Sequence, residues 1–149
     1  MPADRPDRTS EFSFAATDIA VRGALATIRA QLLHSGIDAA VCGKVEIAMA
    51  EAFNNIVEHA YADQSDGVIF CTITQHPDGQ LCITLHDNGH ALPGLDLPAG
   101  TLPDNSGPLE TLPEGGFGWF LIRELTEDLS YRRSDGQNHL TLRFAAPSL

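Results

Sequence analysis

Cysteine is scarce in this sequence, which has only three: Cys42, Cys71 and Cys82. No two of them form a C-x-x-C pair, and their number is odd. Disulfide frameworks and zinc sites both need paired cysteines at suitable spacing, so neither is expected. We expect all three cysteines to be small, buried hydrophobic side chains.

Long hydrophobic runs are also missing. No apolar segment approaches the ~20 residues that a membrane-spanning helix needs, and the opening MPADRPDRTS lacks the hydrophobic region of a secretory signal peptide. We therefore expect neither a transmembrane helix nor a signal peptide. A cytoplasmic protein without a membrane partner is the simplest prediction.

Basic residues are few, because nine Lys and Arg stand against 20 Asp and Glu, for a formal net charge of −11. Binding to nucleic acid or to an anionic membrane needs a basic surface, so this charge argues against both. A phosphate ligand would need glycine amides, a helix N-terminus or a metal ion instead. With 149 residues and 43% hydrophobic content, the chain fits one globular domain.

The chain is predicted to divide into a loose tail, residues 1 to 10, and one domain, residues 11 to 149. A short strand is expected at 11 to 16, where phenylalanines alternate with polar residues. Apolar residues at a 3.6-residue period then predict a helix from Asp18 to about Leu33.

The segment VIFCTITQHPDGQLCITLHD is typical of a hairpin with a three-residue Pro-Asp-Gly loop. With Gly79 left-handed, this loop places Ile73 opposite Ile83 and Cys71 opposite Leu85. All the odd-numbered apolar residues then share one face of the sheet. A two-residue loop would separate them, so it is rejected.

Residues 88 to 114 contain many prolines and glycines and show no periodicity. A loop of this length is more often functional, as a lid or binding loop, than accidental. The stretch GFGWFLIRELTED, which starts at Gly116, then predicts a helix of about three turns.

A last hairpin with a two-residue Asp-Gly turn is predicted to pair Tyr131 with Leu140 and Leu129 with Leu142. Helices interspersed with antiparallel hairpins predict an α+β fold. We expect a two-layer sandwich in which the helices cover one face of a mostly antiparallel sheet.

A second helix, capped by Asp38 and running to about Tyr61, carries a polar stripe of Glu51, Asn55 and His59 at four-residue spacing. Spacing alone favours a solvated face on an amphipathic helix. The alternative is functional, because a carboxylate and an amide oxygen one turn apart could both contact one substrate or one Mg²⁺ ion.

Two further segments could carry chemistry. Asp87-Asn88-Gly89 ends a strand and would be an ordinary turn if it stood alone. Its carboxylate could also accept a hydrogen bond from an exocyclic amine, while the glycine lets a ring approach the backbone. Gly115-Gly116-Phe117-Gly118 opens a helix and is either a flexible hinge or a phosphate site made of free backbone N–H groups.

Other conspicuous residues are expected to be structural. Trp119 and its aromatic neighbours are typical of core or lid packing, and His59 is expected to make a structural hydrogen bond. The pair Arg132-Arg133 is expected to lie on a solvated strand edge.

Taken in order, three motifs resemble those of the GHKL ATPase superfamily, which has the Bergerat ATP-binding fold. AEAFNNIVEHAY on a helix is similar to the N box, LHDNG after a strand to the adenine-binding box, and GGFGWFLI at a helix start to the second glycine box. The resemblance covers roughly residues 11 to 145. It is closest to the anti-sigma factor serine/threonine kinases of bacterial partner-switching systems.

This resemblance implies ATP and Mg²⁺ as ligands. Glu51 would be the general base for a substrate serine or threonine hydroxyl, and Asn55 would coordinate the Mg²⁺ that bridges the ATP phosphates. Asp87 would bind the adenine amino group. The remaining ATP-binding residues would be glycines that let the base approach the backbone and surround the phosphates: Gly89, Gly116 and Gly118.

The implied partners are an anti-anti-sigma (STAS-type) protein, a sigma factor and a second copy of the chain. The sequence departs from the family pattern at Ala91, where a second glycine is usual. It also departs at Gln137-Asn138-His139, where many relatives have Gly-Thr, so a different contact behind the adenine is expected. No Lys or Arg occurs between Asp87 and Gly118. Ala91 and the loop without basic residues favour the alternative, a non-catalytic, partner-binding regulator, whereas Glu51 favours the kinase because a pure binder needs no base. An unrelated α+β domain is a more distant alternative.

Overall fold

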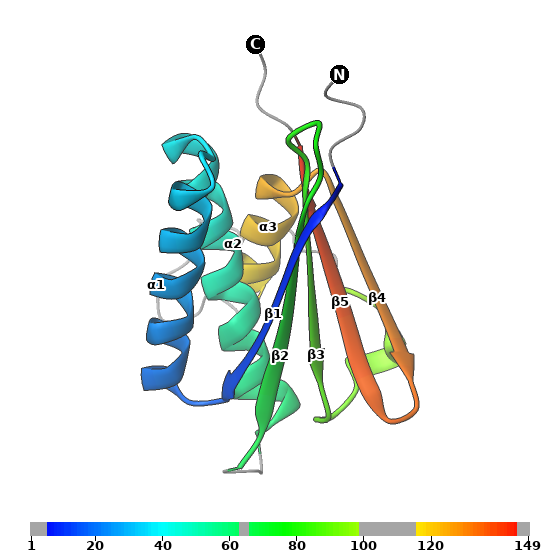
Figure 1. The fold of residues 1–149 in the computed structure, drawn as a ribbon. Coiled ribbons are helices and arrows are strands. Elements are labelled where there is room, and N and C mark those ends of the chain that lie inside the picture. Colours follow the sequence, from blue (N-terminus) through cyan, green and yellow to red (C-terminus); the bar gives the residue numbers. More distant parts are fainter. Residues whose placement is uncertain (1–5, 63–65, 99–115, 146–149) are drawn as a thin grey trace, which may run out of the picture.

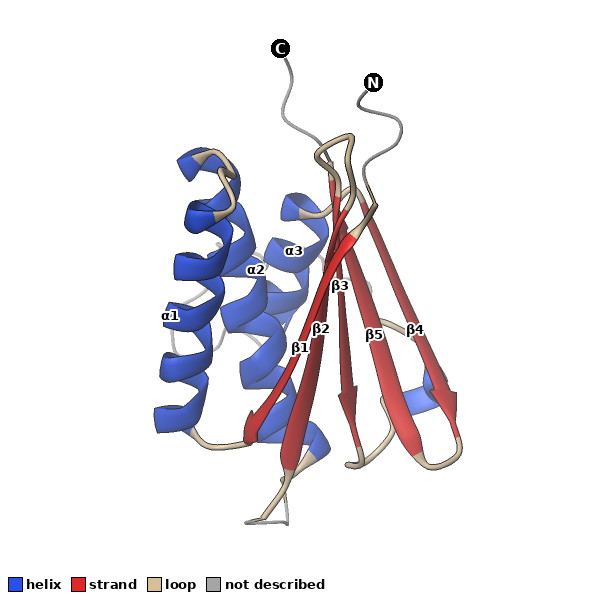
Figure 2. Ribbon diagram, in the orientation of Figure 1, coloured by secondary structure: helices blue, strands red, loops and turns tan. Residues whose placement is uncertain are grey.

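The computed structural model describes residues 6–62, 66–98 and 116–145. A five-stranded sheet in the order β1-β2-β3-β5-β4 is covered on one face by helices (Figures 1 and 2). Every pair of neighbouring strands is antiparallel, so the predicted α+β two-layer sandwich is confirmed. The elements are β1 (Arg8–Ala15), α1 (Asp18–His34), α2 (Ala39–Asn55), the π-helical turn η2 (Ile56–Ala60), β2 (Val68–Gln75), β3 (Leu81–Asp87), the short 3-10 helix η3 (Pro93–Leu95), α3 (Gly116–Leu125), β4 (Asp128–Ser134) and β5 (Gln137–Phe144).

The two long helices begin where the sequence predicted. The Thr17 side chain accepts a hydrogen bond from the backbone N–H of Ala20 and caps α1, and Asp38 caps α2 through the N–H of Ala40. Within the described residues, no helix is both long and apolar enough to cross a bilayer.

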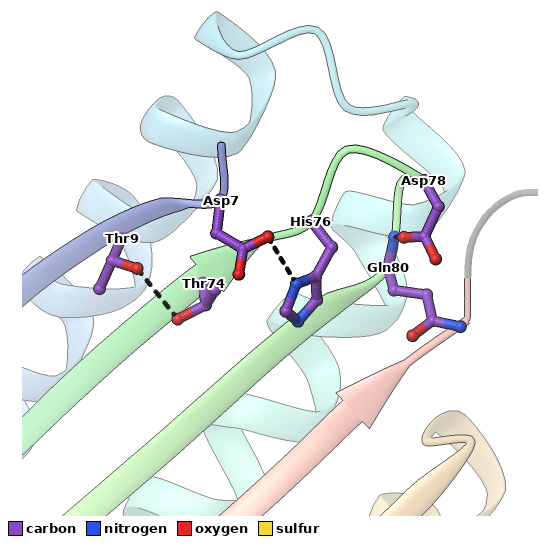
Figure 3. A network of polar contacts seen from close by, with 6 residues as sticks. All are labelled: Asp7, Thr9, Thr74, His76, Asp78 and Gln80. Atoms are coloured by element: carbon purple, nitrogen blue, oxygen red, sulfur yellow. Dashed lines mark hydrogen bonds and ion pairs between the residues drawn. The ribbon is translucent and has the colours of Figure 1, made fainter. Parts of the chain in front are cut away.

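The first strand starts at Arg8, three residues before its predicted start, so it includes the last residues of the predicted tail. Residues 1–5 lie outside the described part of the chain. Polar cross-strand pairs account for the extension: the Thr9 and Thr74 hydroxyls are 3.3 Å apart, and Asp7 Oδ1 lies 2.9 Å from His76 Nδ1 (Figure 3). Hydrophobic alternation could not reveal such pairs.

Both predicted hairpin registers are confirmed. Ile73 pairs with Ile83 and Cys71 with Leu85 in the first hairpin. Its loop contains a glycine with φ of 93° and is fixed by Asp78, whose Oδ1 accepts from the N–H of Gln80 at 2.9 Å (Figure 3). In the last hairpin, Tyr131 pairs with Leu140 and Leu129 with Leu142.

The core lies between the helices and the inner face of the sheet. Cys42 and Cys71 are buried there, whereas Cys82 is half-buried on the other face, and all three are free thiols. The largest fully buried side chains come from both layers: Ile28, Leu32, Val45, Met49, Phe53, Ile69, Ile73, Leu81, Ile83, Leu85, Ile122 and Leu142.

The second helix does not remain α-helical to Tyr61 as predicted. The α-helix ends at Asn55, and the next five residues form the wider π-helical turn η2. Contacts to the end of β3 accompany this change: the Ala60 carbonyl accepts from the N–H of His90 at 2.7 Å, and the Tyr61 hydroxyl accepts from the N–H of Asn88 at 2.8 Å. These partners are distant in sequence, and π-helical turns of this kind are frequent at functional sites.

Candidate functional site

A cavity of about 410 Å³ is lined by residues from the end of α2, the end of β3 and the first half of β5, among others. These ends of α2 and β3 and the start of β5 lie at the lower end of the sheet in Figure 1. This volume is in the usual range for a small-molecule site. Its walls are mostly apolar, with a few polar groups that converge on it. The lining residues are Ala52, Asn55, Ile56, His59, Ala60, Asp87, His90, Ala91, Leu92, Pro93, Pro98, Trp119, Tyr131, Asn138 and Leu140.

Asp87 is the charged group at the buried end of this cavity, and only 4% of its surface is exposed. Its Oδ1 accepts from the N–H of Gly89 at 2.9 Å and from Nδ2 of Asn138 at 2.8 Å. Burial raises the pKa of the carboxyl group, although these two hydrogen bonds and the nearby Arg133 oppose the shift. Among the described residues both hydrogen bonds end on Oδ1, which leaves Oδ2 as an acceptor for a ligand.

Gly89 has a structural role that the sequence did not reveal. A Cβ at this position would overlap the backbone oxygen of Ala60 and lie 2.5 Å from its carbonyl carbon. Only glycine therefore allows the end of β3 to pack directly against η2. The predicted close approach of a base to this backbone stays a prediction.

Asn55 lies in the cavity wall, as its predicted role requires. Its Nδ2 is buried and has no hydrogen-bond partner in the described structure. An unpaired buried amide is costly, so an oxygen-rich ligand at this position would remove a penalty. Glu51, one turn earlier, is half-buried and lies outside the cavity lining.

Glu51 is instead placed against the start of α3. A Cβ on Gly118 would lie 2.7 Å from the Glu51 Oε2, so the glycine leaves space for the carboxylate. The structure thus brings Glu51 and Gly118 together, and separately brings Asn55 and Asp87 to one cavity. Gly116 is the first residue of α3, but its surroundings lie outside the described residues.

Three other predictions concern the edge of the site. Ala91 lines the cavity, and His59 also lines it but is exposed and has no hydrogen bond to any described residue. The structural hydrogen bond expected for His59 is therefore not found. The predicted lid can be followed only to Pro98, because residues 99–115 lie outside the described part of the chain.

The prediction that Arg132-Arg133 forms a solvated edge is wrong for Arg133. Its Nη1 donates to the Gly89 carbonyl at 2.8 Å and to Asn138 Oδ1 at 3.0 Å. Arg132 is exposed, as predicted. The strand alternation contained the necessary signal, because the predicted register of Tyr131 with Leu140 places Arg133 opposite Asn138 on the inner face.

Tyr131 and Arg123 are further residues at the site that sequence reasoning missed, whereas Asn138 belongs to a segment already noted as a departure from the family pattern. Asn138 contacts Asp87 directly, and the Tyr131 hydroxyl accepts from the N–H of Leu92 at 3.1 Å. Arg123 on α3 donates to the Pro98 carbonyl through Nε at 3.0 Å and Nη2 at 2.8 Å. Basic residues from elsewhere in the chain therefore contact a loop that has none of its own.

The sequence matches the family model of the histidine kinase-like ATPase domain over residues 14–144. The chain belongs to this family.

Curated relatives of this ATPase domain include two bacterial kinases. The chain is 37% identical over 92 residues to the serine/threonine-protein kinase BtrW of Bordetella bronchiseptica. The aligned segment covers 62% of this chain and 62% of the relative. The chain is also 35% identical over 101 residues to the serine-protein kinase RsbW of Bacillus cereus. Here the aligned segment covers 67% of this chain and 62% of the relative. The matched segment thus spans less than two thirds of the length of these relatives.

Solved structures show the same ATPase fold. The structure of the RsbU and RsbW domains of Rv1364c from Mycobacterium tuberculosis aligns with 93% of this chain and 32% of its own, at a TM-score of 0.66 and 20% identity. A histidine kinase domain from the Erythrobacter litoralis EL346 blue-light activated histidine kinase covers 87% of this chain and 63% of its own, with a TM-score of 0.53 and 20% identity. At this identity the likeness concerns the fold alone.

The site of this ATPase domain fits an adenine nucleotide with Mg²⁺. Asp87 offers an acceptor at the end of an otherwise apolar cavity, as the amino edge of adenine requires. The Nδ2 of Asn55, which has no partner among the described residues, could donate to an oxygen of such a ligand. Within the described residues, no three His, Cys, Asp or Glu side chains form a metal cluster. An amide oxygen of Asn55 still suits Mg²⁺, which takes few protein ligands when phosphates supply the others.

Proposed function

We propose that the chain is the ATP-binding domain of a Mg²⁺-dependent protein serine/threonine kinase of the anti-sigma type. The observation that carries the proposal is the cavity that joins Asp87 to Asn55, with one carboxylate oxygen available to a ligand and one amide unpaired. The names of the curated relatives, both protein kinases for serine or threonine, support the same activity.

In this proposal each polar residue has a separate task. Asp87 accepts a hydrogen bond from the adenine amino group, and Asn55 contacts the metal and phosphate end of the nucleotide. Glu51 takes the proton of the attacking hydroxyl, and Gly118 keeps the space in which its carboxylate lies. When bound, Mg²⁺ neutralises phosphate charge, so that positioning is the main requirement on the protein.

The proposed substrate is an anti-anti-sigma (STAS-type) protein that presents a serine or threonine hydroxyl. A sigma factor is a second proposed partner, and a homodimer is the proposed assembly. These assignments rest on the motif resemblance and on the similarity to the RsbW and BtrW kinases.

A non-catalytic, partner-binding regulator with the same fold is the second candidate. Ala91 lines the cavity at a position where the family motif usually has a glycine, and Glu51 lies outside the cavity lining. Either feature would be tolerated in a protein that binds nucleotide weakly and transfers no phosphate.

Calorimetry with Mg-ATP tests the nucleotide site. The wild-type chain is expected to bind Mg-ATP, and Asn55→Ala is expected to weaken binding by about tenfold or more, as for loss of a contact to a charged group. The matched control is Asn54→Ala, which alters an exposed neighbour on the same helix and should change affinity by less than about twofold. Equal affinities for wild type and Asn55→Ala would remove Asn55 from the site, and a wild type that does not bind Mg-ATP would remove the proposal.

A further inference from the structure

Asn138 uses all of its hydrogen-bonding capacity inside the protein. Its Nδ2 donates to Asp87 Oδ1 and to the His90 carbonyl, both at 2.8 Å. Its Oδ1 accepts from the Tyr131 hydroxyl at 2.6 Å and from Arg133 Nη1 at 3.0 Å. The side chain is 5% exposed, so water does not compete for these positions.

The partners of Asn138 permit only one orientation of its amide. Arg133 can only donate, and the carbonyl oxygen of His90 can only accept. The Tyr131 hydroxyl already accepts from the N–H of Leu92, so its own proton is directed to Asn138 Oδ1. The amide nitrogen of Asn138 must therefore face Asp87.

This arrangement fixes the Asp87 carboxylate. Oδ1 is held by the Gly89 N–H and by Asn138, while Oδ2 has no hydrogen bond to any described residue, and Asp87 lines the cavity. We propose that Asn138 is a positioning residue for nucleobase recognition: by holding Oδ1 it directs Oδ2 to the exocyclic amine of the base, and so sets the preference for adenine nucleotides over purines without that amine. The inference rests on the proposed ATP site and deepens it.

A purely structural role for Asn138 would give a different result. If the residue only supported the end of β3, its loss would weaken every purine nucleotide by the same factor. If it acts through the Asp87 carboxylate, its loss weakens only nucleotides whose amine Asp87 contacts. Purine riboside triphosphate, which has hydrogen in place of the amine, separates the two roles.

The test compares the dissociation constants of Mg-ATP and of the Mg²⁺ complex of purine riboside triphosphate by calorimetry. The wild type is expected to prefer ATP by about tenfold or more, the range for one hydrogen bond to a charged group. In Asn138→Leu this preference should fall to within about twofold of unity, while affinity for the amine-free analogue changes by less than about threefold. Gln137→Ala, the neighbouring residue without a bond to this network, is the matched control and should keep the wild-type preference.

Two results would overturn the role of Asn138: an unchanged preference in Asn138→Leu, or an equal loss of affinity for both nucleotides. If Asn138→Leu does not fold, Tyr131→Phe removes a single hydroxyl from the same network and should lower the preference about threefold. An unchanged preference in folded Tyr131→Phe would then contradict the inference. A wild type that binds neither nucleotide would instead show that the proposed ATP site is wrong.

Discussion

Asp87 and Asn138 are the only buried side chains of the charged and amide types among the described residues, and each is a hydrogen-bond partner of the other. Burying a carboxylate costs stability unless its partners compensate fully. Here burial outweighs the compensating bonds, because the pKa of Asp87 is raised. A buried carboxylate with a raised pKa in a cavity is a candidate for function.

The raised pKa of Asp87 gives a prediction about stability and pH. Since the folded-state pKa lies above the unfolded one, the contribution that favours folding is fully present below the unfolded pKa and is lost as pH rises through the folded pKa. Ionised Asp87 therefore destabilises the free protein at neutral pH. Asp87→Asn keeps an acceptor oxygen for Gly89 and Asn138 but removes the charge.

Asp87→Asn should accordingly melt at a higher temperature than the wild type at pH 7, and the difference should shrink toward pH 4. Its affinity for Mg-ATP should fall, because one carboxylate acceptor becomes an amide donor. Thermal melts at both pH values, with calorimetry at pH 7, provide the measurement. A variant that is less stable than the wild type at pH 7 would contradict the assignment of Asp87 as a buried, destabilising charge.

The close packing of Gly89 against Ala60 gives a second prediction about stability. Gly89→Ala should destabilise the protein by about 1–3 kcal/mol, as expected for overpacking, because its Cβ would overlap the backbone of Ala60. Gly43→Ala on α2 is the matched control, since a Cβ there has nothing within 4 Å. It should stabilise the helix by about 0.5–1 kcal/mol. Chemical denaturation of both variants checks the sign, and a neutral Gly89→Ala would show that β3 and η2 are not in tight contact.

The family resemblance assigned Asn55 and Asp87 to one nucleotide site, and both line the same cavity, but the contacts of Asn138, Tyr131 and Arg133 were not predicted. The first two belong to short motifs that are ambiguous one by one, and only the order of the motifs along the chain indicated a shared site. The others act through contacts between segments distant in the chain, and only strand parity hinted at Arg133. Glu51, the predicted base, remains untested by the geometry.

Among the elements, the interface of α2 with α3 determines where the proposed base lies. Glu51 on α2 occupies the space beside Gly118 on α3. The end of α2 is fixed separately, because η2 is joined to the end of β3 through Ala60 and His90. Helix α2 therefore contacts α3 where the proposed catalytic carboxylate lies, while the turn η2 that follows it contacts the end of β3 beside the cavity.

Gly118→Ala should separate these two contacts. The nearest atom to the added Cβ is the Oε2 of a flexible side chain, so Glu51 can move and the fold should remain stable. Phosphoryl transfer should fall by about tenfold or more, because small displacements of a catalytic group are costly. Gly23→Ala on α1, where a Cβ meets nothing within 4 Å, should leave transfer unchanged. Wild-type transfer by Gly118→Ala would show that the position of Glu51 is not important.

The elements themselves were largely predictable. Hydrophobic periodicity located α1 and α2, and side-chain parity gave the register of both hairpins. The π-helical turn after Asn55 was not predictable, because hydrogen bonds from His90 and Asn88 accompany it and neither lies near it in sequence. The same reason explains why β1 is longer than predicted, since its first residues pair with β2 through polar side chains.

The acidic composition of the molecule limits how the proposed site could bind the phosphates of a nucleotide. A net charge of −11 disfavours general electrostatic attraction of a polyphosphate. In the proposed function, phosphate binding would then depend on local features such as the start of α3 and the amide of Asn55. Two basic residues near the cavity, Arg123 and Arg133, are already bonded to backbone carbonyls.

The central claim is phosphoryl transfer to a protein hydroxyl, and one measurement tests it most directly. The chain is incubated with ATP labelled at the γ-phosphate, Mg²⁺ and an anti-anti-sigma (STAS-type) protein from the same organism. The wild type should label that protein. Folded Glu51→Ala should do so about 10² times more slowly or worse, as for loss of a general base, while Glu58→Ala, an exposed carboxylate on η2, should match the wild type. Transfer at the wild-type rate by Glu51→Ala, or no labelling by a wild type that binds Mg-ATP, would contradict the account.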